Sequence, residues 1–233
     1  MKGLTLTWLG HSAFHFTSPK GVTGLLDPWV MGNPACPASH KTFPKLDLML
    51  VSHGHFDHIG DAVALAKLHK PEVVAIFETC LWLEGKGVQD TRPMNKGGSQ
   101  TLKGIKVTMV HADHSCGILD DGKVVYGGEA VGYVIAFESG FTLYFAGDTN
   151  VFGDMRLIGE LYRPDAACLP IGDLYTMSPR EAAHAVRLLG ARTIIPMHHG
   201  TFPQLTGRPE ALRALLRDVD CEILDPKPGE ALR

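Results

Sequence analysis

The 233-residue sequence lacks features that would direct it to a membrane, to nucleic acid or to an oxidising compartment. No stretch reaches the roughly 18 uncharged apolar residues of a transmembrane helix, and the N-terminus shows no secretory leader, so we expect a cytoplasmic protein without a membrane partner. The formal net charge is only -3, which argues against the general basic surface of a nucleic-acid-binding protein. The five cysteines are odd in number and form no C-x-x-C pair, which indicates reduced thiols.

Short strands dominate the secondary structure that the sequence predicts. Runs rich in β-branched and aromatic residues, bounded by Gly and Pro, indicate most of them, and a nearly continuous apolar run indicates one strand buried on both faces. A proline-rich stretch at residues 31–45 and a glycine-rich stretch at residues 84–100 are predicted to be loops. The predicted strands cover residues 4–9, 13–17, 22–26, 46–51, 73–77, 105–110, 131–137, 141–145, 166–169 and 193–196, of which 131–137 and 141–145 form a hairpin.

Three helices are predicted, at residues 61–69, 179–189 and 209–219. The second has the clearest boundaries, because a Ser-Pro-Arg-Glu capping box opens it and Gly190 ends it. No linker divides the chain, so residues 1–233 are expected to form a single domain. Two strand-rich halves, each finished by helices, predict an α/β fold of two facing sheets with outer helices, a four-layer αββα sandwich.

The stretch LVSHGHFDHIGD, residues 50–61, gathers three histidines and two aspartates after an apolar run. His53 and His55 are two residues apart and point the same way in an extended loop, so both imidazoles can reach one metal ion, with Gly54 relieving the crowding between them. Asp57 and His58 could serve a second ion or orient a water. Imidazole suits zinc, manganese, iron or nickel, and carboxylate suits harder ions. A loop that only caps a helix through Asp57 would not explain the histidines.

Three further polar loops follow predicted strands. A catalytic metal site needs at least three protein ligands and one open position, so the first loop is not sufficient alone. Each further loop has an ordinary alternative, as a turn or as a surface histidine. Four such loops after buried strands favour a metal site assembled at strand ends. The candidates are His111 or His114, Asp148, and His198 or His199, and spacing alone does not choose within either histidine pair.

The H-x-H-x-D-H pattern at residues 53–58, with the later His, Asp and His loops, resembles the metallo-β-lactamase superfamily over nearly the whole chain. The resemblance implies the αββα sandwich with two mixed sheets. The motifs WLGHSAF, LLDPW, MNKGG, AGDTNVFGDM, LPIGDLYTM and IPMHHGTFP are similar to a narrower family of metal-dependent hydrolases, related to L-ascorbate-6-phosphate lactonase. In one departure from that family, Asp173 follows Gly172 where a second glycine is usual, so no substrate contact is carried over to Asp173 or Tyr175.

The resemblance also implies which residues hold two divalent ions, zinc or manganese, with iron as an alternative. His114 is preferred over His111 by the pattern A-x-H-S, and His198 over His199 by the pattern P-M-H. The implied ligands are His53, His55 and His114 for the first ion, Asp57, His58 and His198 for the second, and Asp148 as the bridge. Three further candidates, for substrate contact or support of the ligands, are His11, Asp27 and His199.

Two ions that share one water lower its pKa from 15.7 toward about 7. The sequence therefore predicts a dinuclear metal-dependent hydrolase whose metal-bridging hydroxide attacks a small ester, lactone or phosphoester, with Asp57 and Asp148 as catalytic residues. Its expected partner is a small-molecule substrate rather than nucleic acid, and the resemblance makes a homo-oligomer plausible. The alternatives are a phosphodiesterase or nuclease, an iron-dependent redox protein and a structural metal protein. Lys41, Arg92 and Lys96 lie in loops that could border the site, although solvated surface charge is the favoured interpretation.

Overall fold

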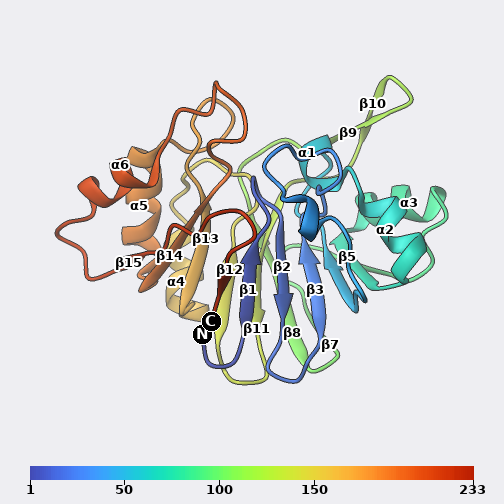
Figure 1. The fold of residues 1–233 in the computed structure, drawn as a ribbon, viewed down its shortest axis with the longest axis horizontal. Helices are drawn as coiled ribbons and strands as arrows, with labels where there is room; N and C mark the ends of the chain where they lie inside the picture. Colours follow the sequence, from blue (N-terminus) through green and yellow to red (C-terminus); the bar gives the residue numbers. More distant parts are fainter.

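Two seven-stranded sheets face each other in the computed structural model, which describes residues 1–233 (Figure 1). The N-terminal sheet contains β1 (Thr5–Trp8), β2 (Phe14–Thr17), β3 (Thr23–Leu26), β4 (Leu48–Leu50), β5 (Glu72–Ile76), β6 (Thr91–Met94) and β16 (Ala231–Leu232). The C-terminal sheet contains β7 (Ser99–Leu102), β8 (Ile105–His111), β11 (Val131–Ala136), β12 (Thr142–Phe145), β13 (Ala166–Pro170), β14 (Thr193–Met197) and β15 (Glu222–Ile223). A separate two-stranded ribbon pairs β9 (Gly117–Asp120) with β10 (Lys123–Tyr126).

Both sheets are mixed, as predicted. The N-terminal sheet has the order β16-β1-β2-β3-β4-β5-β6, and its strands from β3 to β6 are parallel. The C-terminal sheet has the order β15-β14-β13-β12-β11-β8-β7, and its strands from β12 to β15 are parallel. Parallel strands bring their carboxyl ends to one edge of a sheet, where ligand sites of α/β folds form.

Strand β4 shows why its apolar run is continuous. Leu48 and Leu50 belong to the core between the two sheets, whereas Met49 and Val51 belong to a second core on the outer face of the N-terminal sheet. Successive side chains of a strand point to opposite faces, so a strand between two apolar layers needs an apolar residue at every position.

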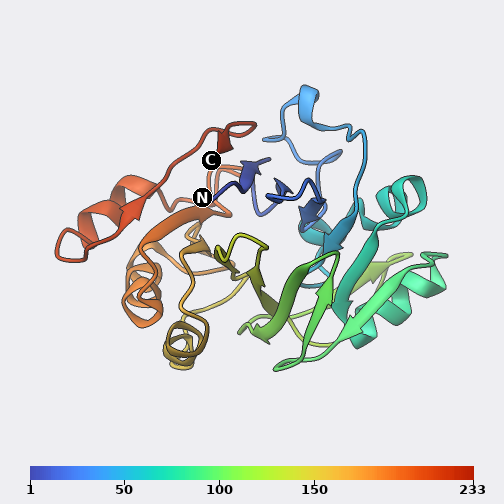
Figure 2. The same cartoon turned by 90° about the horizontal axis from the view of Figure 1, so that it is seen from below.

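Five of the six helices complete the outer layers, which confirms the four-layer prediction (Figure 2). The helices α2 and α3 lie on one side of the sheet pair, and α4, α5 and α6 lie on the other. Ser178 and Glu181 form the predicted capping box at the start of α5. None of the helices combines the length and the apolar character that a bilayer crossing requires. The helix bounds are α1 (Phe56–Ile59), α2 (Ala62–His69), α3 (Phe77–Gly85), α4 (Met155–Tyr162), α5 (Pro179–Leu189) and α6 (Pro209–Leu215).

Several elements differ from the sequence-based prediction. The predicted loop at residues 84–100 contains β6 and begins β7, and the predicted loop at residues 31–45 includes a short 3-10 turn. The predicted strand at 73–77 ends one residue early, because Phe77 already begins α3. The helices α3 and α4 were not predicted. In α3 the Thr, Cys and Trp residues have weak helical preference and the apolar residues lack a helical period, so tertiary packing rather than local sequence fixes this helix.

Candidate metal centre

The candidate ligands gather where strands end. His53, His114 and Asp148 each lie three residues beyond the ends of β4, β8 and β12, and His198 directly follows β14. The hydroxyl of Tyr133 in β11 donates a 2.7 Å hydrogen bond across the sandwich to the carbonyl of Val51. This bond fixes the end of β4 against the opposite sheet, at the point where the histidine-rich loop begins.

Three histidines, His53, His55 and His114, form one group of ligand atoms, which we call the three-histidine group. His53 Nε2 lies 3.0 Å from His55 Nδ1. The other ring nitrogen of each faces a serine hydroxyl, Ser52 Oγ at 3.0 Å from His53 Nδ1 and Ser115 Oγ at 3.2 Å from His55 Nε2. When these nitrogens donate to the serines, the two facing nitrogens both present lone pairs, and a cation between them relieves their repulsion.

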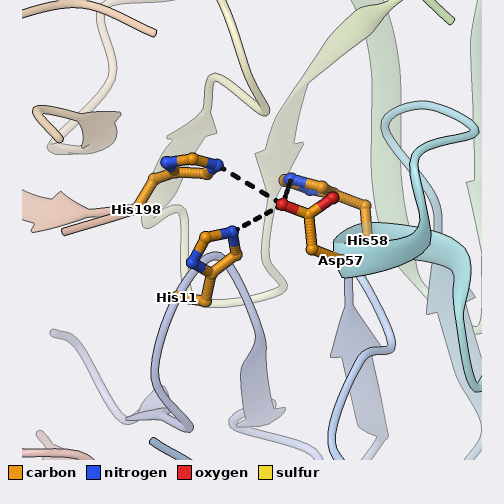
Figure 3. A group of neighbouring side chains, drawn as sticks. All are labelled: His11, Asp57, His58 and His198. Carbon is orange, nitrogen blue, oxygen red and sulfur yellow. Dashed lines mark hydrogen bonds and ion pairs between the residues drawn. The ribbon is translucent and has the colours of Figure 1, made fainter. Parts of the chain in front are cut away.

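A second group, the carboxylate group, consists of His11, Asp57, His58 and His198 (Figure 3). Asp57 Oδ2 lies at its centre, 2.9 Å from His11 Nε2, 3.7 Å from His198 Nε2 and 3.9 Å from His58 Nε2. The three imidazoles reach this oxygen from the loop after β1, from α1 and from the loop after β14.

Asp148 stands between the two groups. Its Oδ2 atom is 3.0 Å from His198 Nε2 and 3.2 Å from His58 Nε2, and it is 3.8 Å from His114 Nε2 and 4.0 Å from His53 Nε2. A carboxylate in this position can serve ligand sets on both of its sides.

Buried polar atoms without partners test whether this residue set fits metal ions. Asp148 Oδ1, His58 Nε2 and His198 Nε2 are buried and make no hydrogen bond. Leaving a buried polar atom unpaired costs roughly 1–3 kcal/mol, so three at one place indicate partners of another kind. The donors are imidazoles and carboxylates without thiolate, since the thiol of Cys116 turns to the Gly127 carbonyl at 3.3 Å. This set fits divalent ions of the zinc, manganese or iron type.

The pKa values of the proposed ligand histidines shift in opposite directions in the two groups, whereas burial lowers the pKa of His11 to about 4. Burial lowers the pKa of His53, His55 and His114, so these imidazoles are neutral near pH 7. Burial acts in the same direction on His58 and His198, but neighbouring carboxylates outweigh it. Asp148, Asp27 and Asp57 raise the pKa of His58 well above its ordinary value, and Asp148 and Asp57 raise the pKa of His198 to about 9.

The two carboxylates show the complementary shifts. Burial would raise the pKa of Asp57 and of Asp148, but the histidines around them outweigh it and hold both pKa values well below the ordinary range. His58 is the largest such influence on Asp57, and His198 is the largest on Asp148. Both carboxylates are therefore ionised across the neutral pH range.

Asp27 supports the ligands from behind and is completely buried. Its Oδ2 accepts from His58 Nδ1 at 2.6 Å and from Ser52 Oγ at 2.7 Å, and its Oδ1 accepts from the Ser52 amide at 2.7 Å. Ser52 in turn contacts His53, so one carboxylate orients a histidine of each group. Carboxylate partners of this kind fix the tautomer of a ligating imidazole and increase its basicity.

His11 and His199 differ in their relation to the site. His11 is fully buried, with Nε2 bonded to Asp57 and Nδ1 3.1 Å from Thr201 Oγ1, so it positions Asp57 and has no free ring nitrogen. His199 instead stacks on Trp8 at a ring distance of 5.2 Å, and burial lowers its pKa to about 4. The structure therefore brings His198, and not His199, into the ligand cluster.

The other sequence candidates lie outside the cluster. The ring of His111 contacts Lys96 at 3.1 Å, and Lys96 also pairs with Glu129. Lys41 donates to the Met31 carbonyl at 2.8 Å and thereby braces the proline-rich loop. Arg92 forms ion pairs with Asp90 and Glu72. None of these three cations borders the ligand cluster.

Left-handed backbone conformations concentrate at the site. His11, Asp27 and His198 have φ values of 57°, 46° and 54°, a region that non-glycine residues enter at a cost. Gly147 also has positive φ, and a Cβ there would lie 2.7 Å from Ser52 Cβ, so only glycine lets the Asp148 loop approach the histidine-rich loop. The surrounding fold holds these residues in conformations that aim their side chains inward.

Gly54 is needed for a different reason from the one the sequence indicated. A Cβ at Gly54 would lie 2.4 Å from Ile118 Cγ1 and 3.3 Å from the Cys116 carbonyl. The glycine thus admits the base of the β9–β10 ribbon against the histidine-rich loop.

A pocket of about 640 Å³ opens over the cluster. Ligand residues and apolar residues line it together, and no lysine or arginine is among them. A larger hollow of about 840 Å³ lies at the opposite ends of β1 and β14 and has no histidine in its lining, so it is separate from this chemistry. The pocket residues are His55, Phe56, Asp57, His114, Ser115, Gly117, Leu119, Val124, Asp148, Tyr175 and His198.

Sequence reasoning missed part of this surface. Phe56, Leu119 and Val124 line the pocket but were not proposed as site residues from the sequence. The hairpin that carries Leu119 and Val124 could have been predicted, because Asp121-Gly122 between two apolar runs is a strong hairpin signal. Of the two residues for which the family pattern gave no guidance, Tyr175 lines the pocket, whereas the Asp173 carboxylate accepts from the Leu174 amide at 2.7 Å within its own turn.

Comparison with known proteins places this geometry in a wider context. Residues 22–199 match the family model described as the beta-lactamase superfamily domain. The chain is 58% identical over 230 residues to a UPF0173 metal-dependent hydrolase of Solibacter usitatus, covering 99% of this chain and 100% of the relative, and 50% identical over 233 residues to one of Rubrobacter xylanophilus, covering 99% and 96%. A solved metallo hydrolase from the archaeon Ignicoccus hospitalis superposes with a TM-score of 0.87 at 34% identity, covering 98% of this chain and 97% of that one.

Proposed function

This chain belongs to the β-lactamase superfamily and to its metal-dependent hydrolases, and from that premise we propose that it hydrolyses a small ester or lactone at a dinuclear metal centre. One observation carries the proposal. Asp148 Oδ2 stands within 4.0 Å of four imidazole nitrogens that belong to two different ligand groups. A single-ion site has no need of a carboxylate shared in this way.

Each ligand has a place in the proposed centre. His53 Nε2, His55 Nδ1 and His114 Nε2 would hold the first ion, zinc or manganese by the chemistry of the donors. Asp57 Oδ2, His58 Nε2 and His198 Nε2 would hold the second, and Asp148 would bridge. When bound, two such ions would supply a water activated by a pKa lowered toward about 7 and a Lewis acid for the substrate carbonyl.

Asp57 is the residue best placed to act on the attacking water. It lines the pocket, and its position is fixed by the hydrogen bond from His11. Since its pKa is held well below the ordinary range, it stays ionised and accepts a hydrogen bond from the water instead of storing a proton. His11 holds the carboxylate in place, and Thr201 holds His11.

The pocket favours esters and lactones over phosphodiesters and nucleic acid. A protein that binds a phosphate backbone neutralises it with lysine and arginine side chains. No such side chain lines the pocket, and Lys41, Arg92 and Lys96 are engaged elsewhere. A neutral acyl group needs no counter-charge.

Metal analysis joined to a hydrolysis screen tests the proposal. Protein loaded separately with zinc, manganese or iron would be measured for bound metal and for turnover of esters, lactones and phosphodiesters. We expect two equivalents of metal and turnover of esters or lactones. His198→Ala should lose the second equivalent and at least about a hundredfold in kcat/KM, more than the usual loss of an outer partner.

His199→Ala is the matched control, since its imidazole is adjacent in sequence but packs on Trp8. We expect it to keep both equivalents of metal and its turnover. Binding of a single equivalent, turnover of phosphodiesters alone, or equal losses in the two variants would contradict the proposal.

A further inference from the structure

We propose that Leu119 and Val124 of the β9–β10 hairpin form a subsite for an apolar group of the substrate, an alkyl or aryl group beside the carbonyl that reacts. This inference rests on the proposed function for the reacting group and adds the chemical class of its neighbour. It predicts that the protein prefers esters and lactones with an apolar substituent to short or anionic ones.

The hairpin presents one apolar face outward. Its turn residues, Asp121 and Gly122, both have positive φ, and this tight turn pairs Leu119 directly with Val124. Directly opposed residues stand on the same face of a ribbon, so these two side chains are neighbours. They are 65% and 77% exposed, whereas Ile118, on the opposite face, is only 1% exposed. The exposed apolar face is thus the one not used for folding.

The hairpin is anchored, although it projects beyond the sheets (Figure 1). Trp82 Nε1 of α3 and Nζ of Lys86, which directly follows this helix, donate to the Asp120 carboxylate at 2.8 and 2.6 Å. Ile118 packs against Gly54 of the histidine-rich loop. These contacts fix the ribbon relative to the metal ligands, so its apolar face is a wall of defined position.

That wall belongs to the same cavity as the ligands. Leu119 and Val124 line the pocket of about 640 Å³ together with Asp148, and Phe56 and Tyr175 line it as well. Phe56 is itself braced edge-on against a tryptophan ring at 5.7 Å. A substrate with its reacting group at Asp148 therefore has apolar side chains beside it for its substituent.

The charge of the pocket selects among possible substituents. Its only charged side chains are the carboxylates and histidines of the ligand cluster, so an anionic substituent would find no cation along the hairpin. Exposed apolar side chains gain free energy when an apolar ligand covers them, in proportion to the area covered. An alkyl or aryl group satisfies both conditions.

Ligand binding tests the subsite without requiring turnover. Acetate, butyrate, hexanoate and octanoate would be titrated calorimetrically into metal-loaded protein. We expect affinity to rise about two- to threefold per added methylene, less than the roughly fourfold of complete burial because the wall is open on one side. The double variant Leu119→Ala/Val124→Ala should lose most of this dependence on chain length. Leu161→Ala, which removes a similarly exposed leucine from α4, should retain it.

Turnover of the matching p-nitrophenyl esters provides a second readout. The ratio of kcat/KM for hexanoate to that for acetate should fall about tenfold in the double variant and stay unchanged in Leu161→Ala. If the affinity depends on chain length but no ester is hydrolysed, the proposed function is wrong and the subsite is retained. Binding that is independent of chain length in the parent protein would overturn the subsite. The subsite would also be overturned if the double variant kept the dependence of affinity on chain length but changed its oligomeric state in light scattering. The apolar face of the hairpin would then join two copies of the chain.

Discussion

The two ligand groups of the metal centre differ in charge, in support and in exposure. The three-histidine group is neutral, and its outer partners are the hydroxyls of Ser52 and Ser115. The carboxylate group carries ionised Asp57, and Asp27 supports its histidine His58 at 2.6 Å. His55 and His114 are partly exposed at the pocket, whereas the histidines of the carboxylate group are buried.

This difference indicates a division of roles within one centre. A neutral set of imidazoles binds an ion without first releasing protons, and its partial exposure leaves room for substrate. A buried set tied to carboxylates is charged before metal arrives, so an ion there replaces protons and completes a network that already exists. We infer that the three-histidine group meets the substrate and that the carboxylate group prepares the nucleophile.

The largest effect should come from removing the residue that the two groups share. Asp148→Asn keeps the shape of the side chain and removes its charge, leaving His198 without its closest anion and His58 without the carboxylate that lies 3.2 Å from its Nε2 atom. Loss of a buried charge partner costs roughly 3–5 kcal/mol of folding stability. An outer partner of a metal ligand is worth about 10–100-fold in activity, so for the shared residue itself we expect turnover to fall by more than about a hundredfold. Metal content measured on the same sample should fall below two equivalents.

Asp113→Asn is the control for this substitution, because Asp113 lies on the adjacent loop, is exposed and bonds Asn150. We expect it to keep its metal and its activity. If Asp148→Asn retained both equivalents of metal and normal turnover, Asp148 would not be a bridge and the two groups would be independent sites.

A smaller and more selective effect is expected from Asp27→Asn. The substitution removes the charge that His58 faces at 2.6 Å, while the contact to His53 passes only indirectly through Ser52. Loss of such an outer partner costs about 10–100-fold in metal affinity. We expect that loss for the second ion and only a few-fold change for the first, measured by competition with a chelator.

Asp47→Asn provides the comparison, since Asp47 is also buried in the N-terminal sheet but bonds Thr23 and Lys45 away from the centre. Asp47→Asn should lower the free energy of unfolding without changing the affinity for either ion. Equal weakening of both ions by Asp27→Asn would show that the two groups do not differ in their support.

The features readable from sequence are those that depend on neighbouring residues. The continuous apolar run of β4 and the capping box of α5 are local patterns, and both led to correct elements. The histidine-rich loop is local as well, since its residues lie within six positions of one another. Helix α4 was not predicted, although its amphipathic pattern is also local, with Met155 and Ile158 buried and Arg156 and Glu160 exposed.

The family resemblance offered His11 and Asp27 as candidates for support of the ligands, but which ligand each one contacts could not be predicted, because that depends on which strands become neighbours. Asp27 contacts His58 from 31 positions away, and it does so because β3 lies beside β4. His11 reaches Asp57 from 46 positions away through a left-handed turn. Spacing alone also left both histidine pairs open, and only the fold shows that the His111 ring faces Lys96.

The last prediction concerns the pH dependence of metal binding, which tests the charge difference directly. In the metal-free protein the pKa of His198 is raised to about 9 and that of His58 is raised well above 6.5, so both are protonated at pH 7 and must lose a proton to bind an ion. Affinity for the second ion should therefore rise between pH 7 and pH 9, by up to about tenfold per pH unit for each proton released.

The three-histidine group should behave differently, because the lowered pKa values of His53, His55 and His114 leave them unprotonated throughout this range. Its affinity should stay level from pH 7 to pH 9. Calorimetric titration in buffers of different ionisation enthalpy counts the protons released with each ion. Equal proton release for the two ions would remove the electrostatic basis of the comparison. In Asp27→Asn the pH dependence of the second ion should weaken, since His58 then lacks one of the carboxylates that raise its pKa.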